Sequence, residues 1–317
     1  MQKEYYLSAI IVTVLCRLCS SVDLPDVHQF ALQKALQKAA SPTNTVIFTI
    51  MDGNMANLMF PPFWRSLNHT AESKHLLVIC QDDNAYALCI SLHQAELCVE
   101  SVANGAPLFR DESSKYHHES CWRKPYVALA IIELGYNILC LDVDVIAFKP
   151  VLPTIDWDQD LMAASDCNRE ENNLTLRRGS PDSGVIFGKA SPASSRFFHK
   201  WLGSRGKPGI ISDQWGLWGT LNETAPSELA YRTWGPPYVM ASFCCHYCNA
   251  LIKSIGSRKK EWRTVCPPQI RQEWVLFQAA CIAWSLDDLP SQKAYDTDLM
   301  KRDALLALWQ LQMGFSL

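Results

Sequence analysis

The sequence lacks an excess of charge of either sign. Its 29 lysines and arginines nearly balance its 32 aspartates and glutamates, which leaves a net charge of −3 at pH 7. A nucleic-acid-binding surface needs a basic stripe or patch, and the basic run at 258–260 is only three residues long. We therefore expect no nucleic acid partner.

Long apolar runs are also missing. The run at 5–16 spans about twelve residues, which is too short to cross a bilayer comfortably. It follows Lys3, ends before Arg17 and is followed by the small residues Ser20 and Ser21, the pattern of a secretory signal peptide. We expect a leader over 1–21, cleaved near Ser21, and a mature chain over 22–317. The alternatives are a buried helix and an uncleaved anchor, and a membrane contact is expected only for the anchor.

A pair of CxxC motifs with zinc spacing is absent as well. Cys245 and Cys248 form a single CxxC without a second half, so zinc is not expected. Disulfides in an oxidising compartment explain the 13 cysteines better. Cys16 and Cys19 fall in the leader, and the remaining eleven are an odd number, so at least one is free or paired between chains. The pairing itself is not readable from the sequence.

Three glycosylation sequons support this compartment, at Asn68, Asn173 and Asn222. With the leader and the cysteines, they predict a glycoprotein of the secretory pathway that lies in the Golgi lumen or is secreted.

The 317 residues, 48% of them hydrophobic, are enough for one large α/β domain or two closely fused halves. Short apolar runs predict buried strands at 45–50, 76–80, 97–99, 138–141, 161–164 and 184–187. Helical patterns lie at 28–40, 85–97, 126–134, 193–202 and 298–312, with a short helix around Trp64 after a break at Pro61 and Pro62. This alternation predicts an α/β fold, with a mostly parallel sheet covered on both faces and a Cys/Trp-rich C-terminal closing segment.

Acidic residues follow several of the predicted strands. Ligands of such sheets bind at the carboxyl ends of the strands, where Asp82, Asp142, Asp144 and Asp166 are expected to lie. The sequence also holds DxD triplets that follow no apolar strand, at 156–158, 158–160 and 296–298. We interpret these three as turn or helix-cap acids without a chemical role.

The DxD pair Asp142 and Asp144 differs because it comes directly after a buried strand. Two close carboxylates repel each other, and a hard divalent cation such as Mn²⁺ or Mg²⁺ compensates this repulsion. Such a cation also neutralises charge on a departing diphosphate. The alternative is an acid pair held by backbone N–H groups or an arginine. His246 is the best candidate for a third metal ligand, although a histidine among cysteines is often structural.

The motifs together resemble the nucleotide-diphospho-sugar transferase family that includes plant cell-wall arabinosyl- and xylosyltransferases (glycosyltransferase family 77-like). The resemblance runs from Thr45 to Trp262. It rests on the strand and DxD at 135–145 together with the helix before them, and on Lys124 and Pro125. Three later motifs, at 182–187, 213–214 and 246–249, follow in the same order as in that family.

The resemblance implies a GT-A fold, with a Rossmann-like nucleotide-binding half at about 45–150, an acceptor or sugar half at about 151–265 and a C-terminal helical segment at 266–317. It implies Mn²⁺ or Mg²⁺, a UDP-sugar donor, a glycan or glycoprotein acceptor and retention of configuration. Donor-binding residues would be Lys124, Asp142, Asp144, Asp182, Ser183 and Gly184, and His246 would complete the metal site. Asp182 stands where relatives often carry asparagine.

The resemblance also implies catalytic roles. Asp213 and Gln214 would face the donor sugar. In a front-face transfer, Gln214 would steady the cationic sugar carbon, and Asp166 or Asp213 would orient the acceptor hydroxyl. Trp215 and Trp218 are candidates for stacking on sugar rings, with core packing as the alternative.

Two other functions compete with this one. A HAD-type phosphatase also places a DxD after a buried strand, with the first acid, here Asp142, as nucleophile. A catalytically inactive sugar-binding protein on the same fold is the second alternative, although both acids of the DxD are intact. The donor sugar and the linkage are not readable, because fold analogy does not carry substrate.

Overall fold

The computed structural model describes residues 26–100, 121–166, 180–210, 212–234, 239–241 and 274–278. The expected leader at 1–21, His246 and the predicted helix at 298–312 lie outside these residues. Within the described ranges, no helix combines the length and apolarity needed to cross a bilayer.

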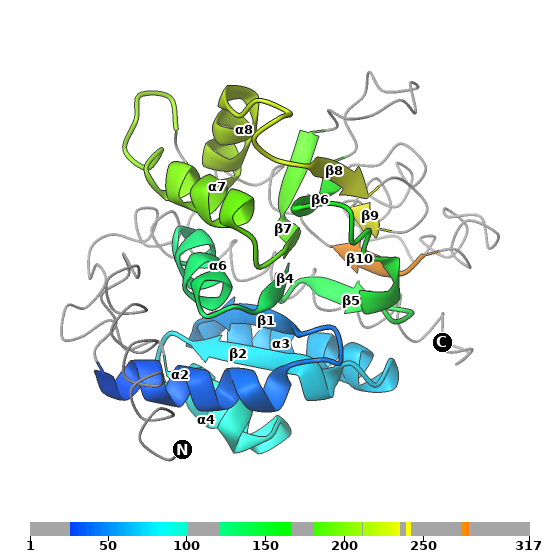
Figure 1. Ribbon diagram of the computed structural model, residues 1–317. Coiled ribbons are helices and arrows are strands. Elements are labelled where there is room, and N and C mark those ends of the chain that lie inside the picture. Colours follow the sequence, from blue (N-terminus) through cyan, green and yellow to red (C-terminus); the bar gives the residue numbers. More distant parts are fainter. Residues whose placement is uncertain are drawn as a thin grey trace, which may run out of the picture.

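The described chain forms a seven-stranded sheet with the order β3-β2-β1-β4-β7-β6-β8 and a three-stranded sheet with the order β5-β10-β9 (Figure 1). The strands are β1 (Thr45–Met51), β2 (Leu76–Cys80), β3 (Cys98–Glu100), β4 (Asn137–Leu141), β5 (Val145–Ala147), β6 (Leu161–Asp166), β7 (Ser180–Gly188), β8 (Tyr231–Trp234), β9 (Val239–Ala241) and β10 (Leu276–Gln278). The main helices are α2 (Asp26–Ala39), α3 (Gly53–His69), α4 (Asp83–Leu92), α6 (Arg123–Glu133), α7 (Pro192–Leu202) and α8 (Asp213–Glu223).

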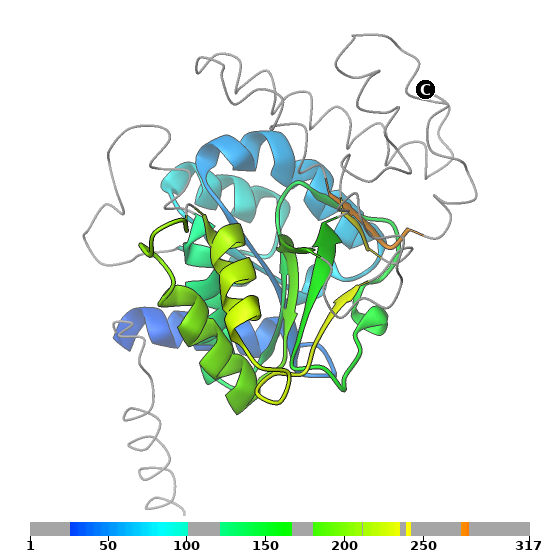
Figure 2. The ribbon, with the colours of Figure 1, turned by 90° about the horizontal axis from the view of Figure 1, so that it is seen from above.

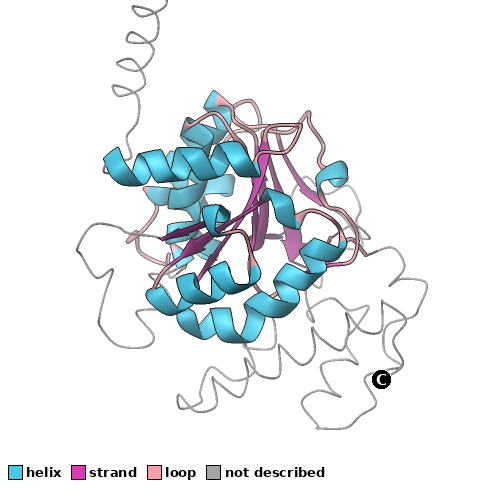
Figure 3. Cartoon of the chain, turned by 90° about the horizontal axis from the view of Figure 1, so that it is seen from below, coloured by secondary structure: helices cyan, strands magenta, loops and turns pink. Residues whose placement is uncertain are grey.

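Helices cover both faces of the large sheet (Figures 2 and 3). Strands β1, β2 and β4 are apolar on both faces, so both faces need such a cover. Successive residues of β1 point to opposite faces: Ile47 and Met51 join a core with α3 and α4, whereas Val46 and Phe48 join a core with α2, α6 and α7. Because both faces are buried, the strand reads as a continuous apolar run. The predicted α/β class with a mostly parallel, doubly covered sheet is confirmed.

Strand β7 is the exception to the parallel arrangement. It pairs antiparallel with β4 on one side and β6 on the other, while β3, β2, β1 and β4 are mutually parallel and β6 is parallel to β8. Leu141, the last residue of β4, pairs with Val185 of β7, and residues 182–184 precede Val185 on that strand. The reversal therefore brings residues 182–184 to the sheet edge at which the parallel strands end.

The predicted chain break at Pro61 and Pro62 is wrong. Helix α3 runs through both prolines. Each proline removes a backbone hydrogen bond of the helix. However, Phe60, Phe63 and Leu67 on this helix are fully buried against the sheet, and tertiary burial outweighs the local preference.

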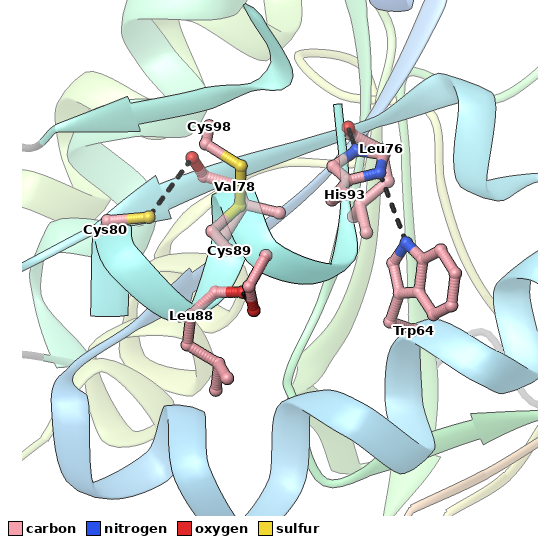
Figure 4. The surroundings of a disulfide bond; sticks show 9 residues. Trp64, Leu76, Val78, Cys80, Leu88, Cys89, His93 and Cys98 are labelled. Carbon is pink, nitrogen blue, oxygen red and sulfur yellow. Dashed lines mark hydrogen bonds between the residues drawn. A yellow bond between two sulfur atoms is a disulfide. The ribbon is translucent and has the colours of Figure 1, made fainter. Parts of the chain in front are cut away.

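Helix α4 ends at Leu92, five residues earlier than predicted, because the next residue is fixed by a different set of contacts. The His93 ring accepts a hydrogen bond from the Trp64 indole N–H at 3.2 Å and its Nε2 donates to the Leu76 carbonyl at 2.9 Å (Figure 4). A disulfide between Cys89 and Cys98 then ties α4 to β3. These contacts fix the turn between the helix and the edge strand.

We predict that His93 makes folding stability depend on pH. Burial lowers the pKa of His93, although the hydrogen bond to the Leu76 carbonyl opposes the shift. Below about pH 6.5, His93 is therefore protonated in the unfolded chain but still neutral in the folded chain. Stability is then constant above about pH 6.5 and falls below it, by at most about 1.4 kcal/mol per pH unit from this one group.

Urea unfolding of the wild type and His93→Gln at pH 8.0 and pH 5.5 isolates this contribution from those of the other histidines. The wild type should lose more stability on acidification than the variant. Equal losses in the two proteins would show that His93 does not titrate as we expect.

The small sheet is anchored to α3. The Ala147 N–H donates to the Ser66 hydroxyl at 3.0 Å, and the Phe148 N–H donates to the Val275 carbonyl at 2.8 Å. Gln278 of β10 pairs with Val145 of β5, the residue that follows Asp144. This pairing brings the end of β10 beside the DxD pair.

Candidate active site

The DxD pair lies in a tight turn between β4 and β5. The Asp142 N–H donates to the Gly184 carbonyl of β7 at 2.8 Å, and the Val145 N–H donates to the Asp142 carbonyl at 3.1 Å. Val143 is fully buried between the two acids. Asp144 is buried, whereas the Asp142 side chain remains 32% exposed. The fold thus holds the backbone of both acids at the ligand-binding edge of the sheet.

Lys124, in the first turn of α6, is the positively charged side chain that contacts the first acid of the DxD. Its Nζ lies 2.8 and 3.0 Å from the two carboxylate oxygens of Asp142 and 3.5 Å from Asp213 Oδ2. It also donates to the Ser183 carbonyl at 2.9 Å. These partners match the three N–H donors of an ammonium group. A lysine, rather than the arginine or backbone N–H groups considered for this role, therefore compensates the first acid of the DxD.

The charge of this lysine is secured by its neighbours. Burial alone would lower the pKa of Lys124, but the carboxylates of Asp142 and Asp213 outweigh burial and hold its pKa well above the usual value. Lys124 is therefore charged at any physiological pH. It brings one positive charge to two contacting carboxylates, and Asp144 adds a third carboxylate two residues from Asp142.

Gln214 supports the backbone of β7. Its side-chain oxygen accepts a hydrogen bond from the Ser183 N–H at 2.6 Å, and its side-chain nitrogen donates to the Pro181 carbonyl. The Asp182 carboxylate accepts from the Gly184 N–H at 2.7 Å. Both the oxygen and the nitrogen of the Gln214 side chain thus bond to the backbone of β7. Gln214 therefore fixes the position of residues 181–184.

Helix α8 begins beside this strand. Its N-cap is Ser212, not Asp213, and the Ser212 hydroxyl accepts from the Trp215 N–H. Asp213 is instead buried in the first turn, with its carboxylate facing Lys124. A serine at the cap leaves the following acid available for the site.

The two tryptophans of α8 differ in their surroundings. Trp218 donates its indole N–H to the Pro181 carbonyl at 2.6 Å, so it helps to hold β7. Trp215 packs against it, with ring centroids 5.4 Å apart, and is among the exposed large hydrophobic residues. Trp218 is therefore half-buried and tied to the backbone of β7, whereas Trp215 keeps a face open to solvent.

The contacts described for the Lys124 cluster include none of the other predicted acidic residues. The backbone of Asp166 lies at the end of β6, paired with Ser180, and nothing is described of its side chain. Asp82 is used by the fold, because its carboxylate caps α4 through the Ala85 N–H and accepts from the Gly53 N–H. Asp156 binds Arg232 and the Asp158 N–H, as expected of a turn acid.

A residue that the sequence did not single out, Gln278, completes the cluster. A side chain at Gly184 would place its Cβ 2.0 Å from the Gln278 side-chain nitrogen. The Gln278 side chain therefore lies directly on Gly184, whose carbonyl holds Asp142. No local pattern marks this glutamine, because its place is set by the pairing of a short distant strand.

The residues present suit a divalent cation by their chemistry. Among the described residues, no group of three histidines, cysteines or acids is placed to hold a metal. Mg²⁺ and similar hard cations, however, commonly take one or two carboxylates from the protein and further oxygens from substrate phosphates. Asp142 and Asp144, on one turn with Asp142 partly open to solvent, fit that pattern.

A mixed α/β sheet with helices on both faces, and with a DxD turn at the carboxyl end of a central strand, is the arrangement expected of a GT-A glycosyltransferase. A sequence model of the nucleotide-diphospho-sugar transferase family matches residues 71–287, more than half of the chain. The chain belongs to this family of glycosyltransferases.

Similar proteins lie at low identity. An uncharacterized protein of Arabidopsis thaliana, At1g28695, is 25% identical over 189 residues, which span 55% of this chain and 55% of that protein. The galactosyltransferase LgtC, solved with donor and acceptor sugar analogues, is 12% identical with a TM-score of 0.46 over 84% of this chain and 95% of LgtC. Mouse xyloside xylosyltransferase 1 is 13% identical with a TM-score of 0.42 over 75% of this chain and 98% of that enzyme.

Family membership does not favour the two alternatives. A HAD-type phosphatase places its DxD strand near the start of its core, whereas β1, β2 and β3 precede β4 here. Against an inactive sugar-binding protein, the family assignment is to transferases, and both acids of the DxD are intact.

Proposed function

We propose that this glycosyltransferase uses a divalent cation, Mn²⁺ or Mg²⁺, to transfer a sugar from a UDP-sugar to a glycan or glycoprotein acceptor with retention of configuration. The observation that carries the proposal is the contact of Lys124 with Asp142, Asp213 and the Ser183 carbonyl. This one side chain joins the DxD turn, helix α8 and the start of β7 into a single site.

The acids of the turn would hold the cation, and His246 is a further candidate ligand. When bound, the cation supplies charge neutralisation for the departing diphosphate. Lys124 adds a fixed positive charge beside it that needs no reorganisation during the reaction. Because Lys124 also fixes the Asp142 carboxylate, it orients the group that the cation requires.

The strand start at 181–184 would form the floor beneath the donor sugar. Gln214 and Trp218 hold its backbone from one side, and Lys124 holds the Ser183 carbonyl from another. We therefore assign Gln214 a positioning role in the ground state. Gly184 leaves the floor without a side chain of its own, and the Gln278 side chain occupies that space.

In a front-face transfer the acceptor hydroxyl attacks the anomeric carbon on the side from which the diphosphate leaves. The bond from the anomeric carbon to the acceptor oxygen forms as the bond to the phosphate oxygen breaks, and the hydroxyl proton passes to a diphosphate oxygen. Asp213, buried with its Oδ2 3.5 Å from Lys124 Nζ, is one candidate for orienting the hydroxyl. Asp166 remains the other candidate for this role.

The Cys89–Cys98 disulfide supports placing this chemistry in the oxidising lumen of the secretory pathway. Recovery of the active chain from the cytosol, with this pair reduced, would contradict that placement.

Titration of UDP into the purified chain tests the nucleotide and metal parts of the proposal together. We expect Mn²⁺ to tighten UDP binding at least about tenfold relative to EDTA, about 1.4 kcal/mol, because Asp142 and Asp144 would hold a cation that neutralises the diphosphate charge. GDP and ADP serve as controls for the base. Equal UDP affinity with Mn²⁺ and with EDTA would remove the cation from the proposal.

A further inference from the structure

Gln278 combines burial with an unsatisfied polar atom. It is the last residue of β10 and only 3% exposed. Its side-chain oxygen accepts no hydrogen bond from any part of the described chain. Buried acceptors are nearly always paired in folded proteins, because burial without a partner costs the hydration of the group. An orphaned acceptor in a candidate active site points to a ligand that supplies the missing donor.

The location of this oxygen is narrowly defined. A Cβ on Gly184 would lie 2.7 Å from both the side-chain oxygen and the side-chain carbon of Gln278, and 2.0 Å from its nitrogen. The amide group therefore covers the Cα of Gly184. On its other side the backbone of Gln278 pairs with Val145, the residue after the DxD turn. The amide thus lies between the floor strand and the turn that carries the acids.

The chemistry of the group narrows the class of ligand. A neutral amide oxygen pairs with a hydroxyl, an N–H group or a cation. An amide also carries N–H donors about 2 Å from its oxygen, so it presents an acceptor beside a donor. Neighbouring hydroxyls on a sugar ring offer the same alternation, since each hydroxyl both donates and accepts.

We propose that the Gln278 side chain binds hydroxyl groups of the donor sugar, its oxygen accepting from one of them, and so determines which sugar is transferred. This inference rests on the proposed function, because it requires a nucleotide-sugar to occupy the site. On this proposal the DxD and Lys124 bind the diphosphate of the donor, and Gln278 binds its sugar. The proposal also explains why residue 184 is a glycine, because any Cβ there would displace the Gln278 amide.

The same observation predicts an unusual pair of effects for Gln278→Met, which keeps the length of the side chain and removes its polar atoms. Folding stability should be unchanged or higher, because the unsatisfied oxygen is gone. The affinity for the donor sugar should fall, because the hydroxyls lose their partner. A residue that served only the fold would show the opposite result on stability and no selective effect on the sugar.

The experiment measures the dissociation constants of UDP, UDP-galactose, UDP-xylose and UDP-arabinose with Mn²⁺ present, in the wild type, Gln278→Met and Gly184→Ala. The probe is the UDP-sugar that the wild type binds more tightly than UDP. We expect both variants to bind it about 10- to 100-fold more weakly, because polar groups built to pair with a substrate discriminate strongly. Binding of UDP should change less than about twofold in Gln278→Met.

The two proposals fail in different ways. Absence of metal-dependent UDP binding in the wild type overturns the proposed function. If UDP and UDP-sugar weaken equally in Gln278→Met, the oxygen serves the metal or diphosphate and the sugar-reading role is overturned. Unchanged binding of the UDP-sugar in a folded Gln278→Met, confirmed by its unfolding midpoint, overturns it as well. Gly184→Ala provides a second displacement of the same amide if the methionine variant does not fold.

Discussion

Replacing Asp142 by asparagine is expected to lower the rate of sugar transfer about 100- to 1,000-fold, the range seen when one preorganised electrostatic contact to a developing charge is lost. Asparagine matches aspartate in size, so the turn between β4 and β5 keeps its packing. The loss has two sources. On the proposed function a bound cation would lose a carboxylate ligand, and the Lys124 ammonium loses the carboxylate whose two oxygens it contacts at 2.8 and 3.0 Å.

The chain contains a matched control for this substitution. Asp158 belongs to a DxD triplet that follows no buried strand, and its side chain is exposed. Asp158→Asn changes the same functional group and should leave both the transfer rate and the Mn²⁺ dependence of UDP binding within about twofold. Comparable losses from Asp142→Asn and Asp158→Asn would mean that the strand context of the first acid carries no function.

Replacing Lys124 by methionine is expected to destabilise the fold by about 3–5 kcal/mol, because removal of one partner leaves a buried carboxylate unpaired. Asp213 is that carboxylate: it is 4% exposed, and Lys124 Nζ lies 3.5 Å from its Oδ2. Methionine keeps the straight apolar stem of lysine, so the packing of α6 changes little. Denaturant unfolding without metal measures the loss.

A double-mutant cycle separates this effect from simple loss of packing. Combining Lys124→Met with Asp213→Asn removes both charges, so the double variant should be more stable than Lys124→Met alone by at least about 1 kcal/mol. Mn²⁺ should raise the stability of Lys124→Met more than that of the wild type, because the carboxylates at the turn are then less compensated. Additive losses in the cycle would contradict the charge pairing.

The parts of the fold that could be predicted are those in which local sequence and tertiary burial agree. Strands β1, β2 and β4 are continuous apolar runs because helices cover both of their faces. The helix before the DxD strand ends at Glu133, one residue before the predicted end, and Gly135 beyond it adopts a φ of +87°. Prediction fails where burial overrides a local signal, as at Pro61 and Pro62 within α3.

The candidate site was predictable to the extent that its residues sit in motifs. Lys124, Asp142, Ser183, Asp213 and Gln214 all lie in the quoted motifs, and the structure brings them into one set of contacts. The lysine as the compensating charge was not predictable, since it lies on the preceding helix and meets the acid only after α6 packs on the sheet.

Two further features depend on pairings that no local pattern encodes. The reversed direction of β7 brings Gly184 opposite Asp142, and the register of β10 brings Gln278 onto Gly184. The disulfide partner of Cys89 is likewise set by the place of β3 beside β2. Each of these requires the tertiary structure.

The central claim is that the Lys124–Asp142 site transfers a sugar from a nucleotide donor with the help of a divalent cation. Release of UDP from a panel of UDP-sugars tests it most directly, measured with Mn²⁺ or with EDTA, beside an Asp142→Ala/Asp144→Ala double variant. We predict release from one donor with Mn²⁺, abolished by EDTA and by the double variant. Release that persists in the double variant, or no release from any donor with acceptor glycans present, would contradict the account.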